Sequence, residues 1–126
     1  MSQYAFHLEL LPGRANEYVR LHSPVPEGIL TQLAAAGIHD YSIFVDGDHV
    51  FGVFRYVDEQ RLADVMEEDV DPEWSSAVVA LTSHRDVDEG LHVPIGIRNV
   101  FRFERGSDTE RTGFAETSLR SERRSP

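Results

Sequence analysis

The hydrophobic pattern of this chain changes period several times, and the order of those changes limits the folds open to it. Residues 3–11 alternate apolar and polar side chains, which predicts a half-buried strand. From Arg14 the apolar residues take helical spacing, and this spacing ends at Gly37, a glycine typical of a helix end. The prolines at 24 and 26 interrupt it, so we expect one kinked helix or two short ones, with the break just after His22.

Two further strands and a second helical region complete the order. The turn at 46–48, Asp-Gly-Asp, joins two runs rich in β-branched and aromatic residues, which is typical of a hairpin. Helical spacing follows from Asp58, a good N-cap, to Leu81, with a break at 69–72. Residues 82–94 are polar and irregular, and 95–103 alternate again. The order β-α-β-β-α-β predicts an α+β fold of the ferredoxin-like arrangement, an antiparallel sheet with helices on one face.

The strand predicted at 49–57 is apolar on both of its faces. One face carries Val50, Phe54 and Tyr56, and the other carries Phe51, Val53 and Val57. Helices can cover only one face, and a large uncovered apolar surface is unusual in a monomer. We therefore expect a homodimer whose sheets pack face to face into a barrel. The domain is expected over 1–104, and the charged, Ser/Thr-rich tail at 105–126 is expected to be disordered.

Charge excludes several classes of partner. The net charge is −10, and all 12 basic residues are arginine. Residues 1–104 hold 18 acids against 7 arginines, a balance of −11, which would repel nucleic acids and anionic membranes. The composition fits a halophile or a high-GC genome equally well. No long apolar run and no secretory signal are visible, so we expect a cytoplasmic protein that does not enter the membrane.

Motifs for metals and cofactors are missing from the sequence. There is no cysteine, no glycine-rich phosphate loop and no His-Glu-x-x-His. The six histidines are dispersed and show no close spacing on one element. We expect no bound metal and no cofactor.

Four side chains are candidates for a binding site. Tyr18 and His22 stand four residues apart and share one helix face, and His22 can exchange a proton near neutral pH. Tyr41 and Trp74 could stack on a sugar ring. Taken singly, each of the four is more simply explained by packing in the core. Asp40 could bind a sugar hydroxyl, but a place in a turn is the simpler explanation.

An ordered set of motifs resembles the L-rhamnose mutarotase family from about residue 3 to 103. The matching segments, in chain order, are Tyr4-Ala5-Phe6, Glu17-Tyr18, His22-x-Pro24, Gly37-x-His39-x-Tyr41-Ser42-Ile43-Phe44-x-Asp46, Trp74 and Asn99-Val100-Phe101. The resemblance implies a dimeric α+β barrel with His22 as the catalytic proton donor. It also implies that Tyr18, Tyr41 and a tryptophan pair bind the sugar, and this pair corresponds here to Trp74 and Ser75.

The activity implied is interconversion of the α and β anomers of a 6-deoxy-L-hexose, most simply L-rhamnose. Ring opening needs a proton at the ring oxygen and removal of one from the anomeric hydroxyl, which a positioned acid or base can supply. Two alternatives share the fold: a non-catalytic module that binds a sugar or small ligand, and another enzyme of this barrel class, such as a cofactor-free monooxygenase.

Overall fold

The structure is a computed structural model that describes residues 1–84 and 86–105. Helices and strands alternate along the chain much as the hydrophobic pattern predicts. In chain order they are β1 (Ser2–Leu10), α1 (Ala15–Leu21), α2 (Glu27–Ala35), β2 (Ile38–Asp46), β3 (His49–Tyr56), α3 (Glu59–Met66), α4 (Pro72–Val79), β4 (Thr82–His84), β5 (Val87–Asp88) and β6 (Val93–Pro94).

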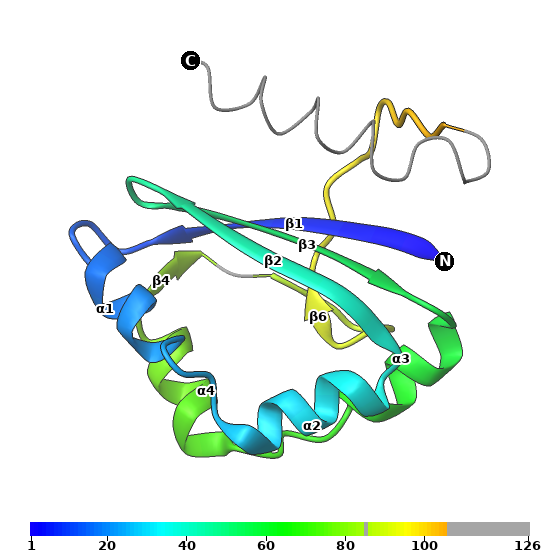
Figure 1. Ribbon diagram of the computed structural model, residues 1–126. Helices are drawn as coiled ribbons and strands as arrows, with labels where there is room; N and C mark the ends of the chain where they lie inside the picture. The colour runs from blue at the N-terminus through cyan, green and yellow to red at the C-terminus, as the bar shows by residue number, and fades with distance from the viewer. Residues whose placement is uncertain (85, 106–126) are drawn as a thin grey trace.

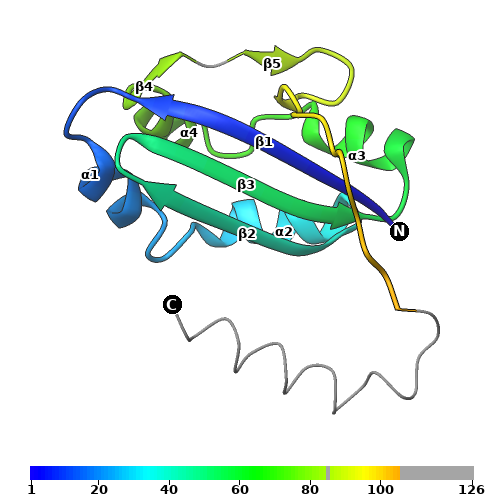
Figure 2. The same cartoon turned by 90° about the horizontal axis from the view of Figure 1, so that it is seen from above.

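The main sheet of the described chain has the strand order β2-β3-β1-β4, and its neighbours pair antiparallel. The sheet is curled, and the helices lie together on its concave side (Figure 1). Seen from above, β1, β3 and β2 lie side by side with the helices behind them (Figure 2). This confirms the expected ferredoxin-like α+β fold, in which the two central strands are β1 and β3.

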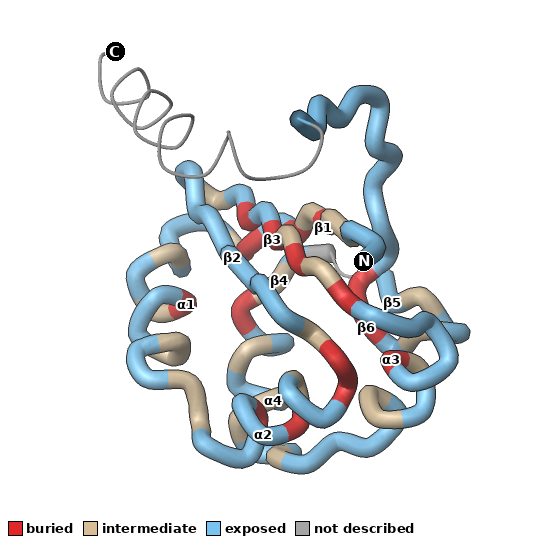
Figure 3. Tube along the Cα trace, turned by 45° about the vertical axis from the view of Figure 1, so that its right-hand side comes forward, coloured by how far each residue is buried: buried red, intermediate tan, exposed pale blue. Residues whose placement is uncertain are grey.

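The face of the sheet toward the helices, here called the inner face, carries the core. Its buried members include Leu8, Val50 and Phe54, and they pack with residues of α1 and α3 in one hydrophobic cluster. The register places Tyr41 of β2 opposite Phe54, so Tyr41 also belongs to the inner face. β2 nevertheless stays exposed along nearly its whole length (Figure 3), because it forms the edge of the sheet.

The opposite face is here called the outer face, and none of the helices formed by the described residues lies on it (Figure 1). Phe44 and Phe51 are paired across β2 and β3 on this face, and they are 60% and 39% exposed. The side chains of His7 and His49 lie beside Phe51, with 3.0 Å between His7 Nε2 and His49 Nδ1. The prediction of a second apolar face is therefore confirmed.

Helix boundaries follow local signals that are visible in the sequence. Asp58 and Asp71 are the N-caps of α3 and α4, and their carboxylates accept hydrogen bonds from the backbone N–H groups of Arg61 and Trp74. Pro72 occupies the first turn of α4, where its missing N–H is not needed. The expected interruption after His22 separates α1 from α2, giving two short helices.

The prediction of a strand at 95–103 was wrong. The segment meets β1 through one bridge between Phe6 and Gly96 and one bond from the Ile97 N–H to the Ala5 carbonyl, at 2.8 Å. Beyond Ile97 it forms no further ladder with β1, and Phe101 is 78% exposed. The place beside β1 is taken by β4, from the stretch expected to be irregular. Of the expected disordered tail, residues 106–126 lie outside the described residues.

Candidate active site

The site begins where α1 ends. The last carbonyl groups of a helix have no partner within it. Here the backbone N–H of His22 turns back to the carbonyl of Val19, at 3.0 Å, so the Tyr18 carbonyl needs another donor. Pro24 and Pro26 follow at once and prevent the helix from continuing. At the end of α1, carbonyl groups of the last turn therefore accept hydrogen bonds from side chains, among them that of His22.

The imidazole of His22 uses one of those carbonyls. Its Nδ1 lies 2.8 Å from the Tyr18 carbonyl oxygen. A carbonyl oxygen can only accept, so Nδ1 must carry the hydrogen and donate it. In the neutral ring, Nε2 then holds the lone pair, and it can take up a proton while the Nδ1 bond persists. The backbone thus selects the tautomer, and Nε2 is the atom able to act as acid or base.

Two aromatic rings flank the imidazole. The Tyr18 ring is buried, 4.4 Å from the His22 ring between centroids, and tilted by 33° to it. The Trp74 ring lies 5.2 Å from it at 71°, an edge-to-face arrangement. The Trp74 Nε1–H donates to the Leu21 carbonyl at 2.8 Å, across 53 residues of sequence. The structure therefore brings Tyr18, His22 and Trp74 together at the end of α1.

Tyr41 lies on the inner face of the sheet. Its ring packs against Phe54 at 5.1 Å and edge-on against Phe6 at 6.4 Å. Phe6 and Phe54 belong to the hydrophobic cluster that also contains Tyr18. Tyr41 is 36% exposed, like its inner-face neighbours Ile43 and Val45. The inner face of β2 therefore offers an aromatic and aliphatic surface that the helices leave partly open.

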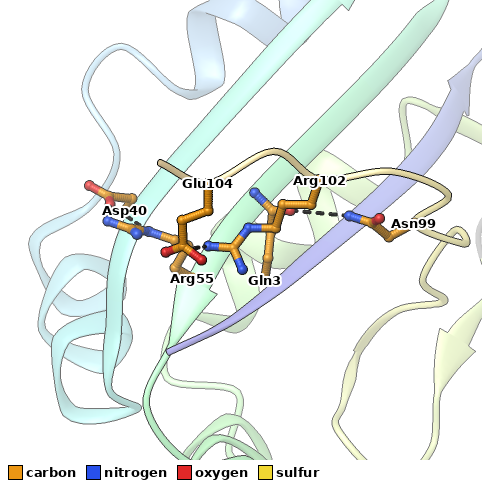
Figure 4. A network of polar contacts seen from close by, with 6 residues as sticks. All are labelled: Gln3, Asp40, Arg55, Asn99, Arg102 and Glu104. Atoms are coloured by element: carbon orange, nitrogen blue, oxygen red, sulfur yellow. Dashed lines mark hydrogen bonds and ion pairs between the residues drawn. The ribbon is translucent and has the colours of Figure 1, made fainter. Parts of the chain in front are cut away.

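Ser75 and Asp40 are held by other partners. The Ser75 hydroxyl donates to a carboxylate oxygen of Asp69, at 2.9 Å, within the turn before α4. Asp40 accepts from Arg55 Nε at 2.9 Å and Nη2 at 2.5 Å. Figure 4 shows this ion pair in a polar network at one end of the sheet, with the pairs Gln3–Asn99 and Arg102–Glu104 nearby. Because Asp40 pairs with Arg55 of the outer face, it does not point into the interior.

Some residues that shape the site were not predicted from the sequence. The Leu21 carbonyl holds the indole, and no side-chain motif can indicate such a contact. Phe6 supports Tyr41, and it fits because Gly52 lies directly opposite it on β3. Asp71 fixes the first turn of α4 and therefore the backbone of Trp74. Only this last role had a signal, the Asp-Pro pair that typically starts a helix.

No group of three or more metal-ligating side chains occurs among the residues that the structure describes. Within the same residues, no helix has both the length and the apolar character needed to span a membrane. The constellation at the end of α1 consists of the His22 imidazole, the neighbouring rings of Tyr18 and Trp74, and backbone carbonyl groups.

Comparisons with known proteins point to one family. The family model of L-rhamnose mutarotase matches residues 3–103. An L-rhamnose mutarotase of Rhizobium meliloti (strain 1021) is 33% identical over 97 residues, which cover 75% of this chain and 93% of the relative. One of Burkholderia orbicola (strain MC0-3) is 41% identical over 76 residues, covering 59% of this chain and 73% of that protein.

Two solved structures share the fold. An L-rhamnose mutarotase from Formosa agariphila superimposes with a TM-score of 0.59 and 20% identity, covering 82% of this chain and all of that one. Tetracenomycin F2 cyclase from Streptomyces glaucescens, a polyketide cyclase, gives 0.55 and 15% with the same coverage. The second likeness shows that this fold also serves other chemistry. Because the family model spans residues 3–103 and the relatives align over most of their length, this chain belongs to the L-rhamnose mutarotase family.

Proposed function

We propose that this protein is a mutarotase that interconverts the α and β anomers of L-rhamnose, with His22 as its acid and base. One observation carries the assignment of the residue: the Tyr18 carbonyl holds Nδ1 at 2.8 Å, which leaves Nε2 for the sugar. The substrate follows from the relatives, which are named L-rhamnose mutarotases. The reaction needs proton transfers alone, so the proposed mechanism uses no metal or cofactor.

The proposed cycle starts with an imidazolium at His22. Nε2–H gives its proton to the ring oxygen of the sugar as the bond from that oxygen to C1 breaks. The anomeric hydroxyl gives its proton to a solvent water molecule, which returns it on ring closure, and C1 becomes an aldehyde. The C1–C2 bond then rotates. The former ring oxygen adds to the other face of C1, its proton returns to Nε2, and the anomeric oxygen regains one. A positioned acid or base of this kind contributes about 10²–10⁴-fold.

Aromatic side chains form the proposed sugar-binding walls. Tyr41 presents a partly exposed ring on the inner face, next to the aliphatic Ile43 and Val45. Such a surface suits the C–H face and the methyl group of a 6-deoxy sugar. Trp74 supplies a second wall beside His22, and Tyr18 orders the imidazole. Sugar contact by Ser75 stays a prediction, since its hydroxyl is already bonded to Asp69.

The proposed enzyme works as a homodimer joined through its outer faces. Phe44 and Phe51 are exposed there, and the smaller Ala5 of β1 and Val53 of β3 are paired on the same face. The register places the Arg55–Asp40 ion pair next to these residues on the same face, and this pair belongs to the polar network of Figure 4. An apolar centre with a polar rim is the usual anatomy of a protein interface. A second copy in this position would close two curled sheets into a barrel.

The test is anomer exchange of L-rhamnose followed by NMR saturation transfer. Wild type should accelerate exchange over buffer, and His22→Ala should lose the contribution of its acid and base, about 10²–10⁴-fold. His92→Asn is the matched control, because His92 is exposed in the turn between β5 and β6 and belongs neither to the proposed site nor to the outer face. Asparagine also suits the positive φ of this position. Equal rates for wild type and His22→Ala would remove His22 from the mechanism. Binding of L-rhamnose without any acceleration would instead identify a non-catalytic sugar-binding module.

A further inference from the structure

The indole of Trp74 has a polar contact that a simple sugar-stacking role does not need. Indole carries one hydrogen-bond donor, Nε1–H, and no acceptor. In this structure that donor is used by the Leu21 carbonyl, at 2.8 Å. It is therefore not available to a sugar hydroxyl while the contact lasts. The bond instead ties α4 to the last turn of α1, two helices that lie side by side (Figure 1).

The same bond determines where the indole stands relative to His22. The backbone of Trp74 is already fixed, because its N–H donates to the Asp71 cap at 3.0 Å. The Leu21 bond then fixes the side chain, and the ring stands edge-to-face against the imidazole, 5.2 Å between centroids. Leu21 and His22 are consecutive residues, so one short stretch of backbone carries both the imidazole and the anchor of its neighbour.

The imidazole depends on that neighbour for its orientation. A single hydrogen bond, from Nδ1 to the Tyr18 carbonyl, leaves a ring free to tilt about the bond. The Tyr18 ring limits tilting on one side, at 4.4 Å. The Trp74 ring provides a second contact of a different kind, edge-to-face, with its plane at 71° to the imidazole where that of Tyr18 is at 33°. Two flanking rings and one hydrogen bond together define the direction in which Nε2 points.

From these contacts we infer that Trp74 is a positioning residue, whose Nε1–H bond to the Leu21 carbonyl holds the His22 imidazole in its reactive direction. This inference rests on the proposed function of His22. In this role Trp74 acts through His22. Stacking of the Trp74 ring face on a sugar would not by itself orient the imidazole. Displacing a catalytic group by about 1 Å can cost up to ~10²-fold in rate.

The chain contains a single tryptophan, which allows a clean test. Replacing Trp74 with 3-benzothienylalanine keeps the shape of the ring and exchanges the N–H for a sulfur atom. Trp74→Phe is the genetically simple companion, and it also removes the donor. Tyr4→Phe is the control: it removes another bond from an aromatic side chain to a backbone carbonyl, the 2.6 Å contact to Pro94, outside the proposed site. The folded fraction of each variant is checked by circular dichroism.

Two measurements decide the outcome. At saturating L-rhamnose the benzothienyl protein should exchange anomers about 10-fold more slowly than wild type, with less than about a twofold change in half-saturation. The ¹⁵N spectrum of His22, assigned by its loss in His22→Asn, should change from the Nδ1–H tautomer alone to a mixture of both. Tyr4→Phe should match wild type in both measurements.

Other results would overturn the inference. An unchanged rate per folded molecule, with the His22 tautomer also unchanged, would leave Trp74 as a sugar wall or a core residue only. A rise in half-saturation at constant maximal rate would place its effect on binding. If wild type itself fails to accelerate exchange, the proposed function falls, and the tautomer spectrum still tests the contact between Trp74 and His22 by itself.

Discussion

The ring of Phe6 occupies the space in which a β-carbon of residue 52 would stand. Phe6 and Gly52 are direct partners across β1 and β3, and a methyl group built on Gly52 would overlap three atoms of the Phe6 ring. Phe6 in turn contacts Tyr41 edge-on, at 6.4 Å. A glycine in the middle of a strand is ordinarily unfavourable. Here Gly52 leaves room for the Phe6 ring, and Phe6 supports Tyr41, the side chain proposed as a sugar-binding wall.

Gly52→Ala should therefore displace Phe6 and disturb Tyr41. Overpacking of this kind typically lowers the free energy of unfolding by about 1–3 kcal/mol. Urea denaturation should show that loss, and half-saturation for L-rhamnose should rise. Gly28→Ala is the matched control, since nothing lies within 4 Å of the methyl group it would add in α2. A Gly52→Ala protein as stable as Gly28→Ala would mean that the Phe6 ring can move without loss.

Alkaline pH should weaken the fold through Tyr4. Burial raises the pKa of the Tyr4 phenol above its ordinary value, and the negative charge of Asp88 raises it further, while a bond from Gly96 acts the other way. An unfolded tyrosine ionises near pH 10. Because the folded pKa is higher, the stabilisation is complete below that pH and is lost as pH rises from there through the folded pKa.

Thermal melting between about pH 8 and 11 can isolate this contribution. Wild type should lose stability at the top of the range more steeply than Tyr4→Phe, which has no phenol to ionise. Below pH 9 wild type should be the more stable of the two proteins, since Tyr4→Phe lacks the hydrogen bond to the Pro94 carbonyl, worth about 1 kcal/mol. Parallel curves for the two proteins would assign the alkaline loss to other groups.

Exhaustive dialysis against EDTA should leave the anomer exchange rate unchanged. The proposed reaction moves protons through His22 Nε2, and no step needs a Lewis acid. Protein-bound metal is measured before and after dialysis, and the exchange assay is repeated with Zn²⁺ and Mg²⁺ added back. A rate that falls on dialysis and returns with one of these ions would replace the imidazole mechanism with a metal-assisted one.

The features that the sequence predicts well are those set by local geometry. Tyr18 and His22 lie four residues apart in a helix, so their contact follows from the helical repeat itself. The Trp74–Leu21 bond joins residues 53 positions apart and depends on how α1 and α4 pack, which no local pattern encodes. The ion pair between Asp40 and Arg55 likewise depends on the register between β2 and β3, which alternation within one strand does not set.

The prediction of a strand at 95–103 failed for a related reason. Alternation of Ile97, Asn99 and Phe101 suits any extended segment that meets an apolar surface on one side, and it does not say which edge the segment pairs with. β1 accepts β4 at Leu10, and the chain passes Tyr4 closely at Gly96, where an added methyl group would lie 3.0 Å from the ring. Beyond Ile97 the segment then has no further ladder with β1.

Phe44→Asp should convert the proposed homodimer into monomers. Phe44 is 60% exposed on the outer face, so the substitution removes little of the core of one chain. In a dimer with twofold symmetry, residue 44 of both copies lies in the interface. Each copy of the Phe44→Asp protein would therefore bury an unpaired carboxylate there. A cost of about 3 kcal/mol or more corresponds to at least ~100-fold weaker association.

Sedimentation equilibrium at micromolar concentration measures this effect directly. Leu30→Asp is the control, because Leu30 is 48% exposed on α2 in the helical layer and away from the outer face. We expect wild type and Leu30→Asp to sediment with the mass of two chains, and Phe44→Asp with the mass of one. A wild type that sediments as one chain would remove the dimer. A Phe44→Asp protein that still sediments as two would move the interface to another surface, and the apolar residues of the outer face would then need a different partner to cover them.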